Sequence, residues 1–218
     1  MDPIKVVGLN CSLKSSGEAS STEAMLGDIV AQMERHAPID YEHVRVADFD
    51  VKPGVKEDEG DGDQWPQIAE KVKACEVLLF GTPIWVGHPS SIAQRVMERM
   101  DAWLFTYNEK GQKLMYGRCA GVAVVGNEDG GHLVHAQVGQ ALSDFGFVQP
   151  PESRAYWTGW TDDSPGPTYK DADGKNHPST KYMIEHTAHN LVWFATIMRQ
   201  HQIPALPSDL EAAAEQDD

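Results

Sequence analysis

Short runs of consecutive apolar residues alternate along the chain with longer segments in which apolar residues recur every three or four positions. The clearest runs are 4–9, 77–81 and 119–126. Their continuous apolar character predicts strands buried on both faces, and the periodic segments predict amphipathic helices. This alternation is typical of a doubly wound α/β fold, in which a parallel sheet carries helices on both faces.

Weaker patterns complete the predicted order of elements. The remaining strands and helices are expected at 41–46 and 154–158, and at 22–35, 68–73, 91–104, 133–145 and 180–201, respectively. The sheet then has five strands. Thr22 is the expected N-cap of the first helix, because a threonine hydroxyl can accept a hydrogen bond from an amide of the first turn.

A length of 218 residues suits one domain. We expect that domain to span 1–204, and the acidic tail at 205–218 to be frayed. Residues 159–179 form a long stretch rich in proline, glycine and aspartate. Because such loops are usually functional or disordered, and this one carries Trp160 and Tyr169, we interpret it as an insertion that forms a lid or a subunit contact and helps to shape the acceptor pocket. A surface insertion without a role is the alternative.

Charge and composition narrow the class of protein. The formal net charge is −15 at pH 7, which disfavours nucleic acid and anionic membrane surfaces as partners. No apolar run approaches the length of a membrane span, the N-terminus lacks a signal-peptide pattern, and the three cysteines form no CxxC pair. A cytoplasmic protein is therefore expected. An anion can still bind to such a protein, but only through a local device such as a cluster of backbone amides.

Three polar loops follow the three clearest strands, at 10–21, 82–89 and 127–132. The carboxyl ends of parallel strands meet at one edge of the sheet, and α/β proteins bind their ligands at that edge. We therefore expect these three loops to form the binding site together.

The first loop reads CSLKSSGEASST and is dominated by hydroxyls. It lacks the G-x-G-x-x-G pattern of dinucleotide sites, the G-x-x-x-x-G-K-[ST] pattern of P-loops, and the arginine that a phosphatase needs beside a nucleophile such as Cys11. What remains is a phosphate cradle of hydroxyls and of amides at a helix N-terminus. Its expected members are Ser12, Lys14, Ser20, Ser21 and Thr22. A flexible loop whose hydroxyls only cap the helix is the alternative.

Together the three loops resemble a known family. The first loop, read as S-x-K followed by serine and threonine at a helix start, resembles the phosphate loop of the NADPH-dependent FMN reductases and related flavodoxin-like quinone reductases. FGTPIWVGHPSS at 80–91 and GNEDGGH at 126–132 resemble the second and third loops of that family. The likeness covers about residues 4–158. It implies a flavodoxin-like sheet with strand order 2-1-3-4-5 and FMN bound without a covalent link.

The resemblance also implies roles for the second and third loops. The residues expected beside the ribityl chain and the ring are Thr82, Pro83, Ile84, Trp85, Val86 and Gly87. Those expected at the pyrimidine edge of the ring are Gly126, Asn127, Asp129, Gly130 and Gly131. His132 is expected to lie by the ring and to steady charge on the reduced flavin. The alternatives are that Trp85 is a core tryptophan and that His132 only opens the next helix.

No metal site is expected. His132 and His135 have zinc-like spacing, but no third ligand is obvious. The acidic run at 57–63 does not match a calcium-binding loop and is interpreted as a solvated loop.

The function that the resemblance implies is an FMN-dependent oxidoreductase. NAD(P)H would reduce the flavin, and a quinone-like or other small acceptor would reoxidise it. The flavin carries this chemistry, so we name no catalytic residue. A flavodoxin-type electron carrier and a flavin-free binding or regulatory module are the alternatives. A homodimer or larger homo-oligomer is expected by analogy with the family.

Overall fold

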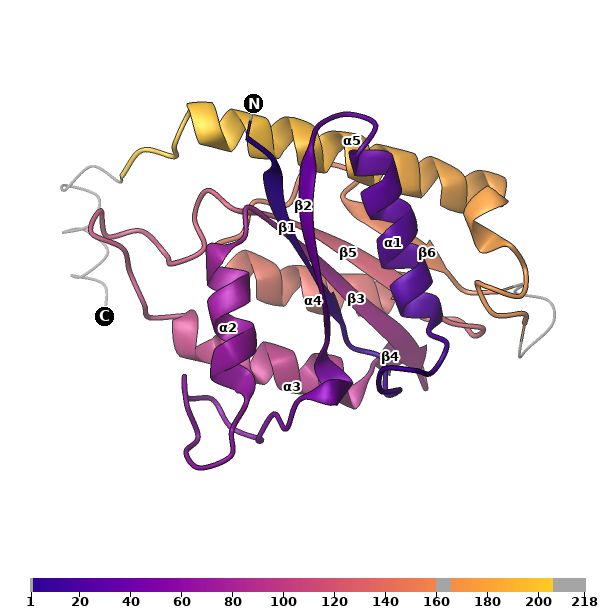
Figure 1. Ribbon diagram of the computed structural model, residues 1–218, viewed down its shortest axis with the longest axis horizontal. Helices are drawn as coiled ribbons and strands as arrows, with labels where there is room; N and C mark the ends of the chain where they lie inside the picture. The colour runs from indigo at the N-terminus through magenta and orange to yellow at the C-terminus, as the bar shows by residue number, and fades with distance from the viewer. Residues whose placement is uncertain (1, 160–165, 206–218) are drawn as a thin grey trace.

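A twisted parallel sheet runs through the centre of the molecule, with helices on both of its faces (Figure 1). The computed structural model describes residues 2–159 and 166–205. The strands are β1 (Ile4–Asn10), β2 (Ile39–Arg45), β3 (Val77–Trp85), β4 (His88–Pro89), β5 (Cys119–Val125) and β6 (Arg154–Trp157). The sheet has the order β2-β1-β3-β5-β6, and β4 pairs antiparallel with β3 outside this path. With β4 set aside, this is the predicted order 2-1-3-4-5, which is confirmed.

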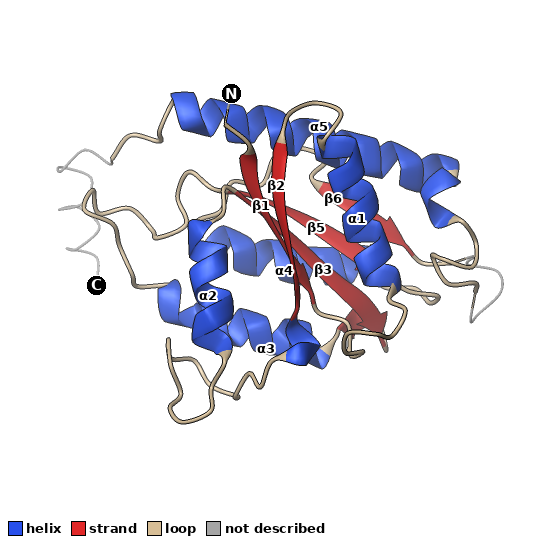
Figure 2. Cartoon of the chain, in the orientation of Figure 1, coloured by secondary structure: helices blue, strands red, loops and turns tan. Residues whose placement is uncertain are grey.

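The helices divide between the two faces of the sheet, as Figure 2 shows. One layer contains α1 (Ser21–Met33) and α5 (Pro178–Gln200), and the other contains α2 (Trp65–Ala74), α3 (Ser91–Met100) and α4 (Gly131–Asp144). Successive side chains of a strand point to opposite faces. Accordingly, Leu78 and Phe80 of β3 pack under the second layer, and Val77 and Leu79 pack under the first.

One row of paired residues crosses the sheet near its carboxyl edge. Arg45 of β2 lies opposite Asn10 of β1, which lies opposite Gly81 of β3; Gly81 lies opposite Ala123 of β5. Asn10 is the last residue of β1 and directly precedes the serine-rich loop, defined here as residues 11–20 and called the serine loop. This register brings the end of β2 beside the start of that loop.

The structure corrects the predicted start of the first helix. Ser20, not Thr22, is the N-cap of α1: its backbone is extended and its hydroxyl accepts a hydrogen bond from the Glu23 amide at 3.2 Å. Three hydroxyl residues in a row can each serve as a cap, and the sequence does not tell which of them leaves the helical conformation. Thr22 is the second residue of the helix.

The ends of two other elements differ from the predicted ends. β3 continues four residues past its predicted end because 82–85 keep pairing with β5 and then with β4. α2 begins at Trp65, before the predicted start at 68, with Pro66 in its first turn, where a missing amide costs nothing. Between α3 and β5, Tyr107 and Lys113 form an isolated antiparallel bridge.

Cys75 and Cys119 each begin an apolar run, which predicts burial of their side chains, and the structure confirms this. Cys11, Cys75 and Cys119 are free and buried. Burial raises the pKa of each thiol, to about 12 for Cys75 and Cys119 and further for Cys11. A protonated, buried thiol is a poor nucleophile, so the chemistry of the site does not come from Cys11.

The predictions about a membrane span and about the acidic tail concern residues that the structure describes only in part. None of the helices in ranges 2–159 and 166–205 is long and apolar enough to cross a membrane. Trp160 and nearly all of the predicted acidic tail lie outside the described residues.

Candidate functional site

The three predicted loops meet at the carboxyl edge of the sheet and enclose a cavity of about 210 Å³. Its lining comes from the serine loop with the first turn of α1, from the ends of β3 and β5, and from two residues that precede α5. The predicted site residues in this lining are Ser12, Lys14, Ser20, Ser21, Thr22, Pro83, Ile84, Trp85, Gly126 and Asn127. Leu13, Val125, Thr168 and Tyr169 complete it. We call this space the first cavity.

A second cavity, of about 620 Å³, is lined by the other part of the predicted set. Its residues are Gly87, Asp129, Gly130, Gly131, His132, Leu133, Tyr156 and Thr158. The second and third loops touch behind it, because a Cβ atom on Gly130 would lie 3.0 Å from the backbone of Gly87. Gly130 has φ +128°, which side chains disfavour, so both its conformation and its neighbour call for glycine.

Thr82 and Val86 line neither cavity. Thr82 is buried, its hydroxyl donates to the Pro83 carbonyl at 3.0 Å, and it accepts from the Ser90 amide at 3.1 Å. Its side chain therefore holds the turn that follows β3.

Val86 and Gly87 form the two-residue turn between β3 and β4. Both have positive φ, at 52° and 76°, which such a tight hairpin turn requires. A β-branched residue rarely adopts this conformation, and the Val86 side chain is 87% exposed. Local strain of this kind is concentrated at functional sites.

The first cavity offers unpartnered backbone amides. No hydrogen bond from the amides of Ser20, Ser21 or Thr22 is formed to the described part of the chain. These are the orphan donors of the start of α1, where the helix dipole also favours negative charge. The site therefore has the parts of an anion-binding helix terminus.

The polar side chains of the serine loop have different tasks. Ser20 caps α1 and also accepts from the Asn10 side-chain amide at 3.5 Å. The Ser12 hydroxyl accepts from the Lys14 amide at 3.3 Å. The Lys14 ammonium donates to the Ala19 carbonyl at 3.0 Å, so its positive charge lies across the loop. Capping explains Ser20, and the hydroxyls of Ser12, Ser21 and Thr22 retain their donor protons.

Two aromatic groups lie beside the cavities. Trp85 is 53% exposed and lines the first cavity, so it is not a core tryptophan. His132 is the second residue of α4, and its Nε2 lies 3.1 Å from the Tyr156 hydroxyl, with the two rings edge to face at 5.2 Å. His132 thus opens the helix and also lines the second cavity. The placement of His132 beside a flavin ring stays a prediction.

His135 does not extend this cluster. Burial, with the nearby Arg154 charge, lowers its pKa to about 4, so the ring is neutral at pH 7. The described residues hold no group of three histidine, cysteine or acidic side chains placed to bind a metal ion.

Sequence reasoning missed several residues of the lining. Thr168 and Tyr169 come from the long segment before α5, and the Tyr169 hydroxyl donates to Asp28 of α1 at 2.6 Å. This contact fixes the segment against the helix that borders the first cavity. Tyr156 and Thr158 come from the end of β6. Tyr169 contacts a residue 141 positions away, and Tyr156 and Thr158 lie at the end of a weakly patterned strand. No local sequence pattern predicts either arrangement.

Comparisons with known proteins agree on one family. The family profile described as NADPH-dependent FMN reductase matches residues 4–162. The 8-demethyl-8-aminoriboflavin-5'-phosphate synthase of Streptomyces davaonensis (strain DSM 101723 / JCM 4913 / KCC S-0913 / 768) is 29% identical over 225 residues, covering 97% of this chain and 84% of that protein. The crystal structure of RosB with bound 8-demethyl-8-formylriboflavin-5'-phosphate superposes with a TM-score of 0.88 at 28% identity, covering 99% of this chain and 88% of that one.

A third relative is much longer than this chain. The protein named divalent metal cation transporter MntH of Mycobacterium bovis (strain ATCC BAA-935 / AF2122/97) is 32% identical over 205 residues. The match covers 91% of this chain but only 29% of that protein. The likeness therefore concerns one part of the longer protein.

Proposed function

The chain belongs to the NADPH-dependent FMN reductase family, and on that premise we propose that it is an oxidoreductase that passes electrons from a nicotinamide donor, through bound FMN, to a small quinone-like acceptor. FMN is the cofactor of the family and NADPH its co-substrate. The acceptor, the choice between NADH and NADPH, and the residues that hold each group are part of the proposal.

The observation that carries the proposal is the row of three unpartnered amides at Ser20, Ser21 and Thr22 beside the first cavity. A protein with net charge −15 repels anions over most of its surface, so a phosphate needs such a local site. FMN ends in a phosphate dianion. The amides, the Ser12, Ser21 and Thr22 hydroxyls and the Lys14 ammonium supply the donors that this group requires.

The rest of the first cavity fits the flat, largely apolar part of a flavin. Ile84 and Trp85 offer apolar surface on one loop, and Gly126 and Asn127 offer backbone and amide groups on the other. A Cβ atom on Gly126 would lie 2.9 Å from the Ile84 side chain, so the two loops can approach only because residue 126 is glycine. The residues present therefore fit the cofactor of the family.

Bound FMN supplies the two-electron chemistry, and the protein supplies binding, orientation and electrostatics. In our proposal the second cavity receives the acceptor. His132 Nε2 lies within hydrogen-bond distance of the Tyr156 hydroxyl there. In the tautomer with a proton on Nε2, His132 donates to the Tyr156 oxygen, and the Tyr156 hydroxyl is then free to donate to a carbonyl oxygen of a quinone-like compound.

The absorption spectrum of the purified chain tests this function. We expect FMN to bind, the visible flavin bands to bleach with NADPH in the absence of oxygen, and a quinone to restore them. FMN should bind much more tightly than FAD, because the first cavity surrounds a terminal phosphate and no G-x-G-x-x-G loop is present for a pyrophosphate. Recovery of mainly FAD from the protein would contradict this assignment.

The same measurements separate the alternatives. An electron carrier would accept electrons but would not sustain NADPH oxidation with a quinone. A flavin-free module would remain colourless after incubation with FMN.

The RosB structure and the synthase relative favour a second candidate function, in which a flavin phosphate is the substrate and not a resident cofactor. RosB binds a flavin phosphate altered at its 8 position, and the superposition with RosB covers 99% of this chain. Mass spectrometry distinguishes the two candidate functions. The flavin is released and its mass measured after incubation of the protein with FMN, the nicotinamide donor and oxygen. An intact FMN mass supports the reductase, and a changed flavin mass supports the second candidate.

We also propose a homo-oligomer, because exposed apolar residues surround both cavities. Leu13 and Trp85 border the first cavity, Leu133 borders the second, and Val86 lies in the turn between them. Light scattering on the flavin-loaded protein tests this. A monomer at micromolar concentration would contradict it.

A single domain spanning 1–204 and a lid role for 159–179 complete the proposal. The Tyr169 contact to Asp28 and the position of Thr168 in the cavity lining support the lid. Replacing 161–177 with a short Gly/Ser linker should leave FMN bound but change acceptor kinetics or assembly, and unchanged values of both would remove the lid role.

A further inference from the structure

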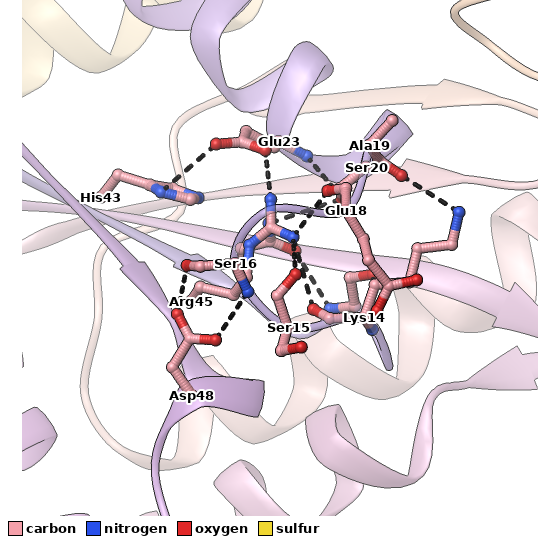
Figure 3. Close-up of polar contacts among 12 residues, drawn as sticks. Lys14, Ser15, Ser16, Glu18, Ala19, Ser20, Glu23, His43, Arg45 and Asp48 are labelled. Carbon is pink, nitrogen blue, oxygen red and sulfur yellow. Dashed lines mark hydrogen bonds and ion pairs between the residues drawn. The ribbon is translucent and has the colours of Figure 1, made fainter.

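The serine loop is held from below by one arginine of another strand. Arg45 is the last residue of β2, lies opposite Asn10 in the sheet, and is only 5% exposed. Its side chain therefore enters the space under the loop that begins one residue after Asn10. Figure 3 shows its guanidinium at the centre of the loop's polar contacts.

The Arg45 guanidinium donates hydrogen bonds to several backbone carbonyls of the loop. Arg45 Nη1 donates to the carbonyl oxygens of Ser15 at 2.8 Å, Glu18 at 3.0 Å and Lys14 at 3.4 Å, and Nη2 donates to the Glu23 carboxylate (Figure 3). A guanidinium presents several donors in one rigid plane, which suits the simultaneous binding of separate acceptors. A loop of serines and one glycine thereby acquires a fixed shape.

Asp48 holds the same loop at a second point. It ends the short 3₁₀ turn Val46–Asp48 that follows β2, and its carboxylate accepts from the Ser16 amide at 2.7 Å and from the Ser16 hydroxyl. These hydrogen bonds lower the pKa of Asp48, so the acceptor stays ionised. The end of β2 thus contacts the loop from two residues three positions apart.

The contacts with Arg45 bear on anion binding in two ways. Carbonyl oxygens carry partial negative charge and would repel a phosphate, and Arg45 engages three of them. The amides of Ser20, Ser21 and Thr22, in contrast, have no partner within the described residues, and these three residues line the first cavity. Because Arg45 binds the loop carbonyls, the unpartnered amides are the groups left to bind a ligand.

The second effect is electrostatic. Glu23 lies in the first turn of α1, one residue after Thr22, and an uncompensated carboxylate there would oppose a phosphate dianion. Arg45 pairs with it. His43 lies 3.8 Å from the same carboxylate, but burial lowers the pKa of His43, so its ring is neutral at pH 7. The compensating charge is that of Arg45.

We propose that Arg45 is the positioning residue of the phosphate site: it fixes the serine loop through three carbonyls and neutralises Glu23, so that the start of α1 can accept the terminal phosphate of a flavin mononucleotide. This inference rests on the proposed function and names a residue that touches no ligand atom itself.

The test compares FMN with riboflavin, which lacks the phosphate. In Arg45→Met we expect FMN to bind about 10- to 100-fold more weakly, the equivalent of one lost charge-assisted contact, and riboflavin to change less than about threefold. Both dissociation constants come from the quenching of flavin fluorescence. An unchanged ratio of FMN to riboflavin affinity overturns the inference.

Arg118→Met is the matched control. Arg118 makes the same kind of contacts at the opposite edge of the sheet, donating to the Lys73 carbonyl at 3.0 and 2.6 Å and to the Leu114 carbonyl at 2.9 Å. Its replacement should lower the melting temperature without changing the FMN-to-riboflavin ratio. A ratio that falls equally in both variants would show general loosening of the fold and would overturn the role of Arg45.

Two further variants keep the test decisive. Arg45→Lys retains a charge but loses the planar fork, so most of the loss of FMN affinity should remain; full recovery overturns the positioning role. Asp48→Asn alters an exposed residue, so the chain should fold even where Arg45→Met does not. We expect it to weaken FMN about three- to tenfold with riboflavin unchanged, because one charge-assisted acceptor is lost.

The wild-type chain separates this inference from the function on which it rests. If the wild type binds neither flavin, the proposed function fails and the inference fails with it. If the wild type binds FMN and Arg45→Met binds it equally well, only the inference fails.

Discussion

The serine loop and the loop at 52–63, called here the acidic loop, are built on the same support. Each is a long irregular segment held by one buried arginine from another element. Arg99 of α3 donates to the Lys52 carbonyl at 2.9 Å, the Lys56 carbonyl at 2.8 Å and the Asp63 carboxylate at 2.7 Å. Arg45 binds carbonyls and one carboxylate of its own loop and helix in the same manner.

The two loops differ in what happens to their amides. In the acidic loop, amides donate to the loop's own carboxylates: those of Lys52 and Glu59 to Asp63, that of Lys56 to Glu59, and that of Gly60 to Asp58. Asp63 also accepts from the amide of Trp65, the first residue of α2. In the serine loop, hydroxyls replace most of these carboxylates, and three amides at the start of α1 keep no partner within the described residues. The same support thus gives a closed scaffold in the acidic loop, whose carboxylates accept from its own amides. Beside the serine loop it gives an open donor site, because the nearby carboxylates of Asp48 and Glu23 are bound to Ser16 and Arg45 and not to the three amides.

Removing the arginine of the acidic loop should have the largest effect on stability. Arg99 and Asp63 are both fully buried, so Arg99→Met leaves a buried carboxylate unpaired and should lower the free energy of unfolding by about 3–5 kcal/mol. FMN and riboflavin affinities of the folded fraction should not change. Urea unfolding measures the first quantity and fluorescence quenching the second.

Arg95→Met is the control for that variant. Arg95 lies on the same helix, is exposed, and within 2–159 and 166–205 it donates only to the Val51 carbonyl, at 3.1 Å. Its loss should cost much less stability. If Arg99→Met changes the FMN-to-riboflavin ratio, the two loops are coupled and the contrast between them breaks.

Removing hydroxyls from the serine loop should have the largest effect on binding. Ser12→Ala combined with Thr22→Ala should weaken FMN on the order of 100-fold, because two charge-assisted contacts to phosphate are lost, and should weaken riboflavin far less. Thr196→Ala is a control, since that hydroxyl donates to the Val192 carbonyl within α5. Equal losses for both flavins would mean that the hydroxyls are structural.

Acid should weaken the acidic loop in a defined window. Burial alone would raise the pKa of Asp63, but hydrogen bonds from the Glu59 amide and the Arg99 guanidinium outweigh it and hold the pKa at about 2. A depressed pKa contributes stability above the unfolded value near 4, and this contribution is lost as pH falls through about 2. It amounts to about 2 kcal/mol. The difference in unfolding free energy between wild type and Asp63→Asn should shrink as pH falls from 4 to 2, and a constant difference would contradict the assignment.

The smallest expected effect concerns Tyr169, which lies in the segment before α5 and lines the first cavity. Tyr169→Phe removes the hydrogen bond to Asp28, which contributes about 1 kcal/mol. FMN should dissociate about three- to fivefold faster, as followed by stopped-flow fluorescence. Tyr107→Phe, at an exposed site distant in sequence, should leave the rate unchanged. An unchanged rate in Tyr169→Phe would show that this contact does not retain the flavin.

Strands and loops were predictable from the sequence to different degrees. Continuous apolar runs predicted β1, β3 and β5, because burial on both faces leaves no room for polar positions. The meeting of three loops at one edge followed from the parallel arrangement alone. The apolar run predicted that β3 ends at 81, but Thr82 and Pro83 still pair opposite Val124 and Val125 and the strand continues.

The arginines could not be assigned roles from the sequence. Arg45 ends a weakly patterned strand and Arg99 lies within an amphipathic helix, and each contacts a loop 27 to 47 residues away along the chain. Such pairings depend on the register of strands and the packing of helices. Tyr169 is similar, since it meets Asp28 across 141 positions. The residues that shape the site were therefore less predictable than the residues that line it.

β2 lies at the edge of the sheet, and its outer backbone has no neighbouring strand in the described order. Edge strands open locally more readily than central ones, and an open edge is a template for aggregation. Arg45 reaches the serine loop only while β2 is docked. If Arg45 positions the phosphate site as proposed, ligand binding and edge docking would stabilise each other. A bound flavin would then act as a folding ligand, shielding the strand of the sheet most prone to intermolecular pairing.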